Sequence, residues 1–599
     1  MILSIIDKIN VMILKVQQIF TAMLLTVMTA VVLLQIILRY FLSFPTPWAE
    51  EIARILMIWI VLIGAAGMMI KGEHLCVDVF YRHFSVRMKK IIRVVYDAAI
   101  LIFVCFVIYF SCRLLANPVI YKSHTPIAGL PLILYYLGLP ISMTLMAIFE
   151  IGDIIQGMMD LCKPDRSKKG GEDMSVVLWL LLGILMFAGF PIFFAMGGVS
   201  TLMLLVEGTA APMSIIQKMV YALDSFPLMA VPFFILAGEI MNRSGVTERI
   251  FSFAQTLVGH MHGGLGQVNV LASAFMAGCS GSAVSDVAGL GKVEIKAMSD
   301  AGYDTPFAAA VTAATATIGP IIPPSIPMVM YGSIAGVSVV KLFLGGIGPG
   351  VLMIIAMMLI VYVVSKRRSY PREERSTLKQ ILRSFIKSFP AIMMPVILLM
   401  SILSGIMTPT EGACFACLYA VFLGVVVYKT ITIRDLWDIL KTSSSFMSTT
   451  LIVIGMSGVL GLVLTQQQIP QKMLGLFLSV TSNKYVMLLL VNILLIILGC
   501  LIEAGPIIVI LAPLLANVAI AYGVDPVHMG VVVVFNLMVS LCTPPVGMCL
   551  FLAAKVADIS TVSLIKEVIP FLIILFVVLI LITYVPATVT FIPGLFAAS

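Results

Sequence analysis

The chain has 599 residues, of which 61% are hydrophobic and 11% are charged, and its formal net charge is +8 at pH 7. Ordinary soluble domains carry about 25% charged residues, so a water-soluble core is excluded. The Lys and Arg residues lie in short loops between apolar runs, where they orient membrane proteins, and they do not indicate a nucleic-acid partner. The composition predicts a multi-pass protein of the inner (cytoplasmic) membrane.

Apolar runs of roughly 20 residues, the length that spans a bilayer, recur along the sequence. Residues 20–38 and 176–194 are two examples. No long stretch alternates apolar and polar residues as the strands of a membrane β-barrel do. We therefore predict an all-α polytopic fold.

Residues 1–162 form a small part with four predicted spans. An amphipathic entry helix is expected at the start of the chain, over positions 1–20. The spans are placed near residues 17–38, 52–71, 94–115 and 131–158. Glu50, Glu51 and Arg54 are expected to pair at the entrance of the second span, either to dock the small part onto the rest or as a solvated interfacial cluster.

A polar segment at residues 163–175 is predicted to be a cytoplasmic linker to a large part. A basic connector at 366–388 divides the large part into 176–365 and 389–599. We expect the connector to be a cytoplasmic, surface-lying helix, and membrane lipid headgroups are an additional candidate partner for it.

The large part repeats itself on either side of this connector. Glycines, aspartates and prolines recur at one constant offset in the numbering: Gly278, Gly302, Asp304, Pro323 and Pro349 match Gly499, Gly523, Asp525, Pro544 and Pro570. Internal repeats of this kind are typical of secondary transporters. The large part is therefore interpreted as an internal duplication.

Each repeat contains an apolar segment with a break in its middle, at residues 264–301 and 485–522. Both are interpreted as re-entrant hairpins. Counting spans between the basic loops places the first hairpin on the cytoplasmic side and the second on the outer side, so the repeats are predicted to be inverted.

Each repeat also has a Pro-Pro break, GPIIPPS at 319–325 and CTPPVG at 542–547. Proline lacks an N–H and disfavours helix before it, so each break frees carbonyl oxygens, which are sodium ligands. A carboxylate at the bilayer centre costs roughly 2.5 kcal/mol or more, whereas a helix N-terminus returns about 0.3–1 kcal/mol. Co-bound sodium ions, two or more per monoanion, are expected to offset the remaining free-energy cost and to couple sodium movement to substrate movement.

Five segments resemble the tripartite ATP-independent periplasmic (TRAP) transporters. In the large part they are GLGQVNVLASAFMAGCSGSAVSDVAGLG at 264–291, GPIIPPSIPMV at 319–329 and TPTEGA at 408–413. In the small part they are RYF at 39–41 and PWAEEIAR at 47–54. The resemblance covers nearly the whole chain and implies a bacterial protein in which the family's small and large membrane subunits are fused.

The resemblance also implies an elevator-type mechanism, sodium coupling, a soluble extracytoplasmic substrate-binding protein as partner, and a small organic acid anion such as sialic acid or a C4-dicarboxylate as substrate. It implies a substrate site at Ser282, Asp286 and Ser325. It implies one sodium site with Ser280, Ser282, Gly319, Ile322 and Pro324 and, through the repeat, a second with Gly499, Glu503, Thr543 and Pro544.

Several alternatives remain open for these residues. Ser280 and Ser282 can serve tight helix packing, and Asp286 can cap the second arm of its hairpin. The second hairpin has Leu501 and Glu503 where the first has Ser280 and Ser282, so the two ion sites cannot be copies, and Glu503 can instead form a structural hydrogen bond. Glu411, in the TPTE turn, fits a helix cap at least as well as a transport role.

Other functional classes lack their motifs. The spans contain no His/Asp pair, no HExxH and no metal cluster, and the chain has no GxxxxGK[ST] motif, which argues against an enzyme, an organic cofactor and direct use of ATP. A stand-alone sodium/dicarboxylate symporter, which needs no binding protein, is the alternative transporter. The fused small part favours the TRAP type.

Overall fold

The computed structural model describes residues 2–71, 86–161, 181–183, 185, 190–208, 210–544 and 547–597, so the predicted linker at 163–175 lies outside it. The described residues form helices, with one isolated β-bridge between His124 and Pro131 and no strand. Ten helices in this part of the chain are long and apolar enough to cross a membrane. The prediction of an all-α polytopic fold is confirmed.

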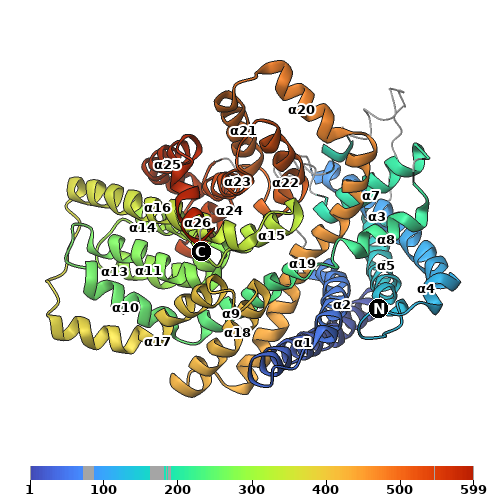
Figure 1. Ribbon diagram of the computed structural model, residues 1–599, viewed down its shortest axis with the longest axis horizontal. Coiled ribbons are helices and arrows are strands. Elements are labelled where there is room, and N and C mark those ends of the chain that lie inside the picture. The colour runs from blue at the N-terminus through green and yellow to red at the C-terminus, as the bar shows by residue number, and fades with distance from the viewer. Residues whose placement is uncertain are drawn as a thin grey trace. The chain divides into compact units, whose positions relative to one another are not determined.

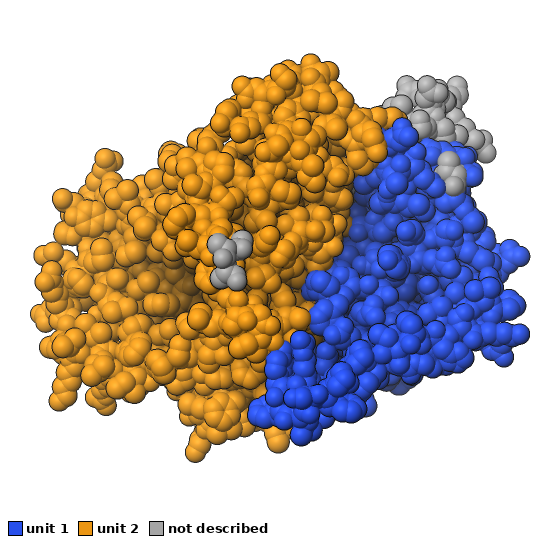
Figure 2. Space-filling view, in the orientation of Figure 1, with its two compact units in different colours: residues 1–229, 440–469 blue, residues 230–439, 470–599 orange. Residues whose placement is uncertain are grey.

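The chain folds into two compact units (Figure 2). Unit 1 contains residues 1–229 and 440–469, and unit 2 contains residues 230–439 and 470–599.

Unit 1 contains the small part, and its four predicted spans are confirmed. Its helices are α1 (Ile2–Phe41), α2 (Pro47–Lys71), α3 (Val86–Leu115), the short α4 (Pro118–Lys122) and α5 (Ile133–Leu161). The expected entry helix and first span form one continuous helix, α1. Residues 1–41 contain neither Gly nor Pro, so nothing in this segment favours a break.

The small part packs on large-part helices within unit 1. These are α7 (Ile192–Val206), α8 (Pro212–Tyr221), the 3₁₀ turn η2 (Pro227–Met229) and the second half of α19 (Ile433–Gln466). Gly64 of α2 lies so close to α19 that a Cβ there would stand 1.9 Å from Ser448 Oγ. The Ser448 hydroxyl donates to the Ile60 carbonyl at 3.0 Å. A small residue on α2 therefore permits a close helix–helix contact.

The three charged residues at the entrance of α2 have separate partners. Arg54 pairs with Asp224 of the large part at 2.8 Å. Glu51 accepts hydrogen bonds from the Ile127 and Ala128 amides, and Glu50 accepts one from Gln35 at 3.1 Å. The expectation that they pair with one another is wrong, whereas docking of the small part is confirmed for Arg54.

Unit 2 holds both predicted hairpins and both Pro-Pro breaks, and most of its helices are labelled in Figure 1. Its first half contains α9 (Ala230–Arg243), α10 (Val246–Val258), α11 (Gly264–Ser280), α12 (Ala283–Ala288), α13 (Leu290–Asp300), α14 (Thr305–Thr315), η3 (Ala316–Ile318), α15 (Ile326–Ala335) and α16 (Val339–Arg368). Next come α17 (Leu378–Leu403), α18 (Pro409–Phe422) and the π-helical η4 (Leu423–Val427). The second half contains α20 (Ile469–Val480), α21 (Lys484–Gly499), α22 (Ala504–Ala521), α23 (Pro526–Ser540), α24 (Met548–Ala557), α25 (Thr561–Tyr584) and α26 (Ala587–Ala597).

The helices repeat at the spacing that the sequence predicts. Helices α12 and α22 begin at Ala283 and Ala504, and α14 and α23 begin at Thr305 and Pro526, so both pairs keep the constant offset of the sequence repeat. The turns before α14 and α23 each contain a glycine with positive φ, +89° at Gly302 and +67° at Gly523. The N-caps that follow are aspartates in both repeats. The helices therefore follow the duplication that the sequence indicates.

The two repeats exchange partners in unit 2. Helix α15 packs against α22 of the other repeat, and its counterpart α24 packs against α12 and α13. In the same way α14 packs against α25, and α23 packs against α16. Reciprocal pairs of this kind are expected when two copies are related by an approximate two-fold axis. The direction in which each repeat crosses the bilayer stays a prediction.

The basic connector is not one helix along its length, which corrects that expectation. Helix α16 ends at Arg368, where Ser369 adopts a φ of +55°. Pro371 follows, and a proline cannot continue a helical hydrogen-bond pattern. The next helix, α17, begins at Leu378 behind a capping box formed by Thr377 and Gln380. The last basic residues therefore belong to the first turns of α17.

Candidate ion and substrate site

Both predicted hairpins fold back on themselves. In the second hairpin, the Tyr522 hydroxyl donates to the Thr481 carbonyl at 2.7 Å and joins the two ends of the segment. In the first, α12 and α13 pack back against α11. The hairpin shape of both segments is confirmed, and their re-entry into the membrane stays a prediction.

The tip of the first hairpin rests on the first Pro-Pro break. Gly281 has a φ of +57°, and a Cβ there would lie 2.7 Å from the Pro324 carbonyl oxygen. Ser282 is the N-cap of α12, and its hydroxyl accepts the Ser285 amide at 3.4 Å. The side chain of Ser280 lies outside what the structure describes. A glycine is required at the tip because both the backbone conformation and the contact exclude a larger residue.

Asp286 and Gly319, two of the predicted site residues, are in contact. Asp286 lies in α12 and is only 2% exposed. A Cβ at Gly319 would lie 2.6 Å from Asp286 Oδ2. A buried carboxylate oxygen therefore lies directly beside the backbone of the Pro-Pro break.

Ser325 occupies the N-cap of α15. Its hydroxyl accepts the Met328 amide at 3.2 Å and donates to the Pro320 carbonyl, and the residue is completely buried. Helix α16 supports the break from the other side. A Cβ at Gly350 would lie 2.5 Å from Ile322 Cγ1. The break is therefore enclosed by protein, as irregular backbone at membrane depth requires.

The predicted backbone ligands have carbonyl oxygens that accept no hydrogen bond from the backbone of the helices and turns around them. Among the residues that the structure describes, the carbonyls of six positions accept no backbone N–H: Gly319, Ile322, Pro324, Gly499, Thr543 and Pro544. Hard cations prefer such oxygen ligands. The two breaks, together with Gly499 at the tip of the second hairpin, therefore offer two groups of open carbonyls, one in each repeat.

The second repeat has different chemistry at its tip. Gly499 packs on Ser540. A Cβ at Gly499 would lie 2.5 Å from Ser540 Cβ. The Thr543 hydroxyl donates to the Val539 carbonyl at 3.0 Å.

Glu503 takes the N-cap position of α22 without a side-chain cap bond. Its Oε2 is buried and has no hydrogen-bond partner among the described residues, a set that lacks residues 545 and 546. The structural hydrogen bond considered for Glu503 is therefore not made by any described residue.

A buried polar network around Asp286 was not predicted from the sequence. Asn269 of α11 donates to Thr312 of α14 at 2.7 Å and accepts from Thr315 at 2.6 Å. Thr312 also bonds to Glu294 of α13, whose side chain is 1% exposed and lies near Asp286. The signal available in the sequence is Glu294 itself, a carboxylate in a predicted membrane hairpin.

A related link occurs at the corresponding place in the second repeat. Asn536 of α23, at the repeat position of Thr315, donates to the Asn492 side chain of α21 at 2.8 Å. Asn492 in turn donates to Thr583 of α25 at 3.0 Å. Both hairpins are thus tied through an asparagine of the first arm to the helix that leads into the Pro-Pro break.

Glu411 has a structural role in the described contacts. It accepts the Thr408 amide at 2.9 Å while its own amide bonds to the Thr408 hydroxyl, which completes a capping box at the start of α18. The interpretation of Glu411 as a helix cap is confirmed.

Two family models match the chain. The model of the "Tripartite ATP-independent periplasmic transporter, DctM component" matches residues 178–588, and the model of the corresponding DctQ component matches residues 28–159. Both the broken helices described above and the four-helix small part therefore lie within recognised components of this family.

Curated relatives agree with these matches. The chain is similar to the sialic acid TRAP transporter permease protein SiaT of Haemophilus influenzae, with 33% identity over 94% of this chain and 96% of the relative. It is similar to the large permease protein SiaM of Vibrio cholerae, with 42% identity over 70% of this chain and 98% of the relative. A C4-dicarboxylate TRAP transporter large permease protein of Rhodobacter capsulatus is 34% identical over 70% of this chain and 99% of the relative.

These relatives are named as transporter permeases and not as enzymes. Together with the ten apolar helices of the described residues, they make the chain a multi-pass inner-membrane protein. The chain belongs to the tripartite ATP-independent periplasmic transporter family and joins its DctQ and DctM components in one polypeptide.

Proposed function

We propose that this permease imports a small organic acid anion, driven by a sodium gradient, and that a soluble extracytoplasmic binding protein delivers the substrate. The observation that carries the proposal is the contact between Asp286 and Gly319, which puts a buried carboxylate beside open backbone carbonyls. Ligands of this kind suit a small hard cation.

The negative charge beside the first break favours a cation bound between the protein and the anionic substrate. Asp286 and Glu294 are two buried acidic side chains that lie close together, so the Asp286 carboxylate would repel an unaccompanied carboxylate substrate. A sodium ion beside Asp286 removes this repulsion and leaves Ser282 and Ser325 near the substrate. The two groups of open carbonyls, one per repeat, support two sodium ions per cycle.

The cross-packing of the two repeats supports a moving body that carries both hairpins. Because α15 packs on α22, and α24 packs on α12 and α13, each hairpin is packed against the helix after the other repeat's break. The hairpins and breaks are then expected to travel together, as an elevator mechanism requires.

Sialic acid is the first substrate candidate, because both SiaT and SiaM are sialic acid permeases by name. A C4-dicarboxylate is the second candidate, supported by the Rhodobacter capsulatus relative. A stand-alone symporter is less well supported, because the DctQ match and the docked small part fit a permease that works with a partner protein.

The test is uptake by the purified chain in liposomes. Labelled sialic acid and succinate are supplied with and without an inward sodium gradient, and with and without the candidate binding protein. We expect uptake only when sodium and the binding protein are both present. Uptake that ignores the gradient would refute sodium coupling, and uptake without the binding protein would favour the symporter.

Two substitutions test whether the predicted residues form the transport site. Ser282→Ala and Asp286→Ala are each expected to abolish uptake in folded protein. Ser338→Ala is the matched control, because Ser338 caps α16, which belongs to neither hairpin, through a 3.4 Å bond of the same kind to the Lys341 amide. If uptake survives both site substitutions, the proposed site is misplaced.

A further inference from the structure

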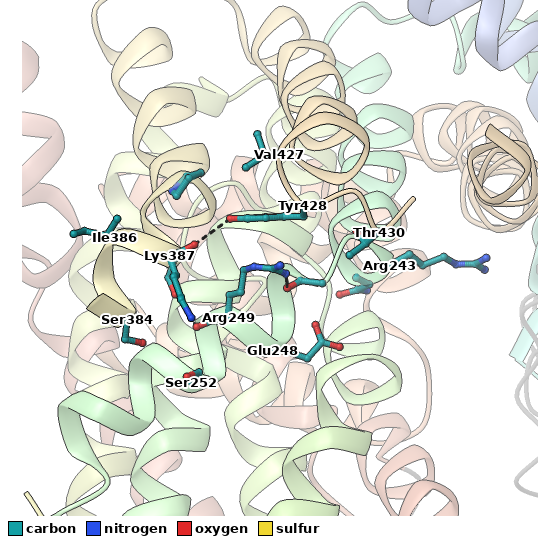
Figure 3. Close-up of a pocket in the computed structure, with 14 residues that line it drawn as sticks. Arg243, Glu248, Arg249, Ser252, Ser384, Ile386, Lys387, Val427, Tyr428 and Thr430 are labelled. Carbon is teal, nitrogen blue, oxygen red and sulfur yellow. Dashed lines mark hydrogen bonds between the residues drawn. The ribbon is translucent and has the colours of Figure 1, made fainter. Parts of the chain in front are cut away.

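A basic cleft lies in unit 2 away from both hairpin tips and both Pro-Pro breaks. Its volume is about 860 Å³. It is formed by the end of α9 and the start of α10, by the first part of α17, and by the turn that follows η4 (Figure 3). Helices α10 and α17 lie side by side (Figure 1).

Two contacts hold the Arg249 side chain in this cleft. Its guanidinium carbon lies 3.8 Å from the centre of the Tyr428 ring, close enough for a cation–π contact. One guanidinium nitrogen donates to the Gly245 carbonyl at 2.6 Å. Across the cleft, the Tyr428 hydroxyl donates to the Lys387 carbonyl at 3.5 Å, as the dashed line in Figure 3 shows. The ring therefore fixes Arg249 close to the Lys387 turn of α17.

The cleft carries an excess of positive charge. Its charged lining residues are Arg243, Arg249, Lys387 and Glu248. Arg243 is paired with Glu239 at 3.1 Å. Arg249 and Lys387 form no ion pair with any residue that the structure describes. Two cations thus lack a carboxylate partner, and an anion with several oxygen acceptors is the ligand that satisfies them.

The rim of the cleft is apolar and exposed. On α17 the lining residue Ile386 is 63% exposed, and Leu382 and Phe389, one turn away on either side of it, are 56% and 44% exposed. At the end of η4 the lining residue Val427 is 43% exposed. The same turns of α17 carry Lys379, Arg383 and Lys387. A helix that combines exposed apolar residues with Lys and Arg is typical of the interface between headgroups and acyl chains.

We propose that this cleft binds the phosphate-bearing headgroup of an anionic phospholipid. The phosphodiester accepts hydrogen bonds from Arg249 and Lys387, and the acyl chains run along the apolar rim. Ser252 and Ser384, which also line the cleft, supply neutral donors for the rest of the headgroup. Free phosphate has the same acceptor oxygens, but it leaves the apolar rim exposed, so the rim selects the lipid.

The experiment is native mass spectrometry of the full chain in detergent, titrated with phosphatidylglycerol, with zwitterionic phosphatidylcholine and with inorganic phosphate in separate arms. We expect a saturable phosphatidylglycerol site that phosphatidylcholine fills at least tenfold more weakly. Arg249→Gln and Lys387→Gln should each weaken phosphatidylglycerol binding about fivefold, the usual effect of one basic residue near an anionic lipid surface.

Lys379→Gln is the matched control, since Lys379 lies on the same exposed turns of α17 but does not line the cleft. The affinity of Lys379→Gln for phosphatidylglycerol should stay within about twofold of that of the unmodified chain. Arg249→Lys, which keeps the charge and loses the planar contact with Tyr428, provides a second variant if Arg249→Gln does not fold, and should weaken binding by a smaller factor. Equal losses in Lys379→Gln and Arg249→Gln would overturn the proposal, as would inorganic phosphate that displaces phosphatidylglycerol.

Discussion

The Asp286 carboxylate and the backbone of Gly319 are packed so closely that a methyl group at residue 319 would lie 2.6 Å from Oδ2. Real Cβ atoms do not approach an oxygen this closely, so any side chain at residue 319 displaces the carboxylate. The distance from the break to Asp286 is thus set by the absence of a side chain on Gly319.

Gly319→Ala should therefore weaken the response to sodium while the protein still folds. The sodium concentration that gives half-maximal uptake is expected to rise about tenfold, which corresponds to about 1.4 kcal/mol of binding free energy. The measurement is initial uptake in liposomes as a function of sodium concentration. Gly475→Ala is the control, because nothing lies within 4 Å of a Cβ at that residue of α20. An unchanged sodium response in Gly319→Ala would show that Asp286 does not contribute to the ion site.

Glu503→Gln distinguishes a charged ion ligand from a structural residue. Glu503 Oε2 is buried without a hydrogen-bond partner among the described residues, so the amide breaks no described hydrogen bond of that oxygen but removes a negative charge. We expect the half-maximal sodium concentration to rise at least tenfold, about 1.4 kcal/mol, with little change in thermal stability.

The control for this substitution is Glu411→Gln. Glu411 is also buried, but it serves a capping box, in which Gln can replace Glu. Its sodium response should match that of the unmodified chain. If the two variants behave alike, Glu503 is not an ion ligand.

Thr312→Val tests the network that joins the two arms of the first hairpin to α14. The substitution keeps the shape of the side chain and removes its hydrogen bonds to Asn269 and Glu294, both of which are buried. Leaving buried polar groups unsatisfied should lower the free energy of unfolding by about 1–3 kcal/mol. Thermal or denaturant unfolding in detergent measures the change.

Thr317→Val supplies the comparison, because the Thr317 hydroxyl is also buried but, among the described residues, bonds only to the Ala314 carbonyl one turn earlier. Its effect should not exceed about 1 kcal/mol. A Thr312→Val protein as stable as Thr317→Val would mean that the network adds nothing to the folded state.

The hairpins could be predicted closely because their breaks are local. The predicted segments 264–301 and 485–522 differ by one residue at most from the helices that run from Gly264 to Asp300 and from Lys484 to Ala521. Glycine and proline act on their own backbone and on the residue beside them, so a single sequence reveals them. The constant offset between the repeats then located the second hairpin from the first.

The polar network could not be predicted in the same way. Asn269, Thr312 and Glu294 lie on three different helices, and each is an unremarkable residue until α11, α13 and α14 are packed. The pairing of Arg54 with Asp224 has the same character, since the two residues are far apart in the chain. Contacts of this kind depend on tertiary packing, which local sequence patterns do not carry.

Gly64→Ala tests how the small part is attached to the large part. The added methyl group would lie 1.9 Å from Ser448 Oγ and 2.6 Å from its Cβ, so α2 and α19 must separate. Overpacking of this kind should cost about 1–3 kcal/mol in the free energy of unfolding. Gly461→Ala, on α19 but with open space around its Cβ, should leave stability unchanged or raise it by up to about 1 kcal/mol. The double variant Gly64→Ala with Ser448→Gly returns space to the contact and should recover part of the loss, even though it gives up the bond from Ser448 to the Ile60 carbonyl. The free energies of unfolding of the double variant and of Gly64→Ala are then compared. If the double variant is the less stable of the two by more than the loss of the Ser448 bond explains, the close approach of α2 and α19 does not hold the small part in place.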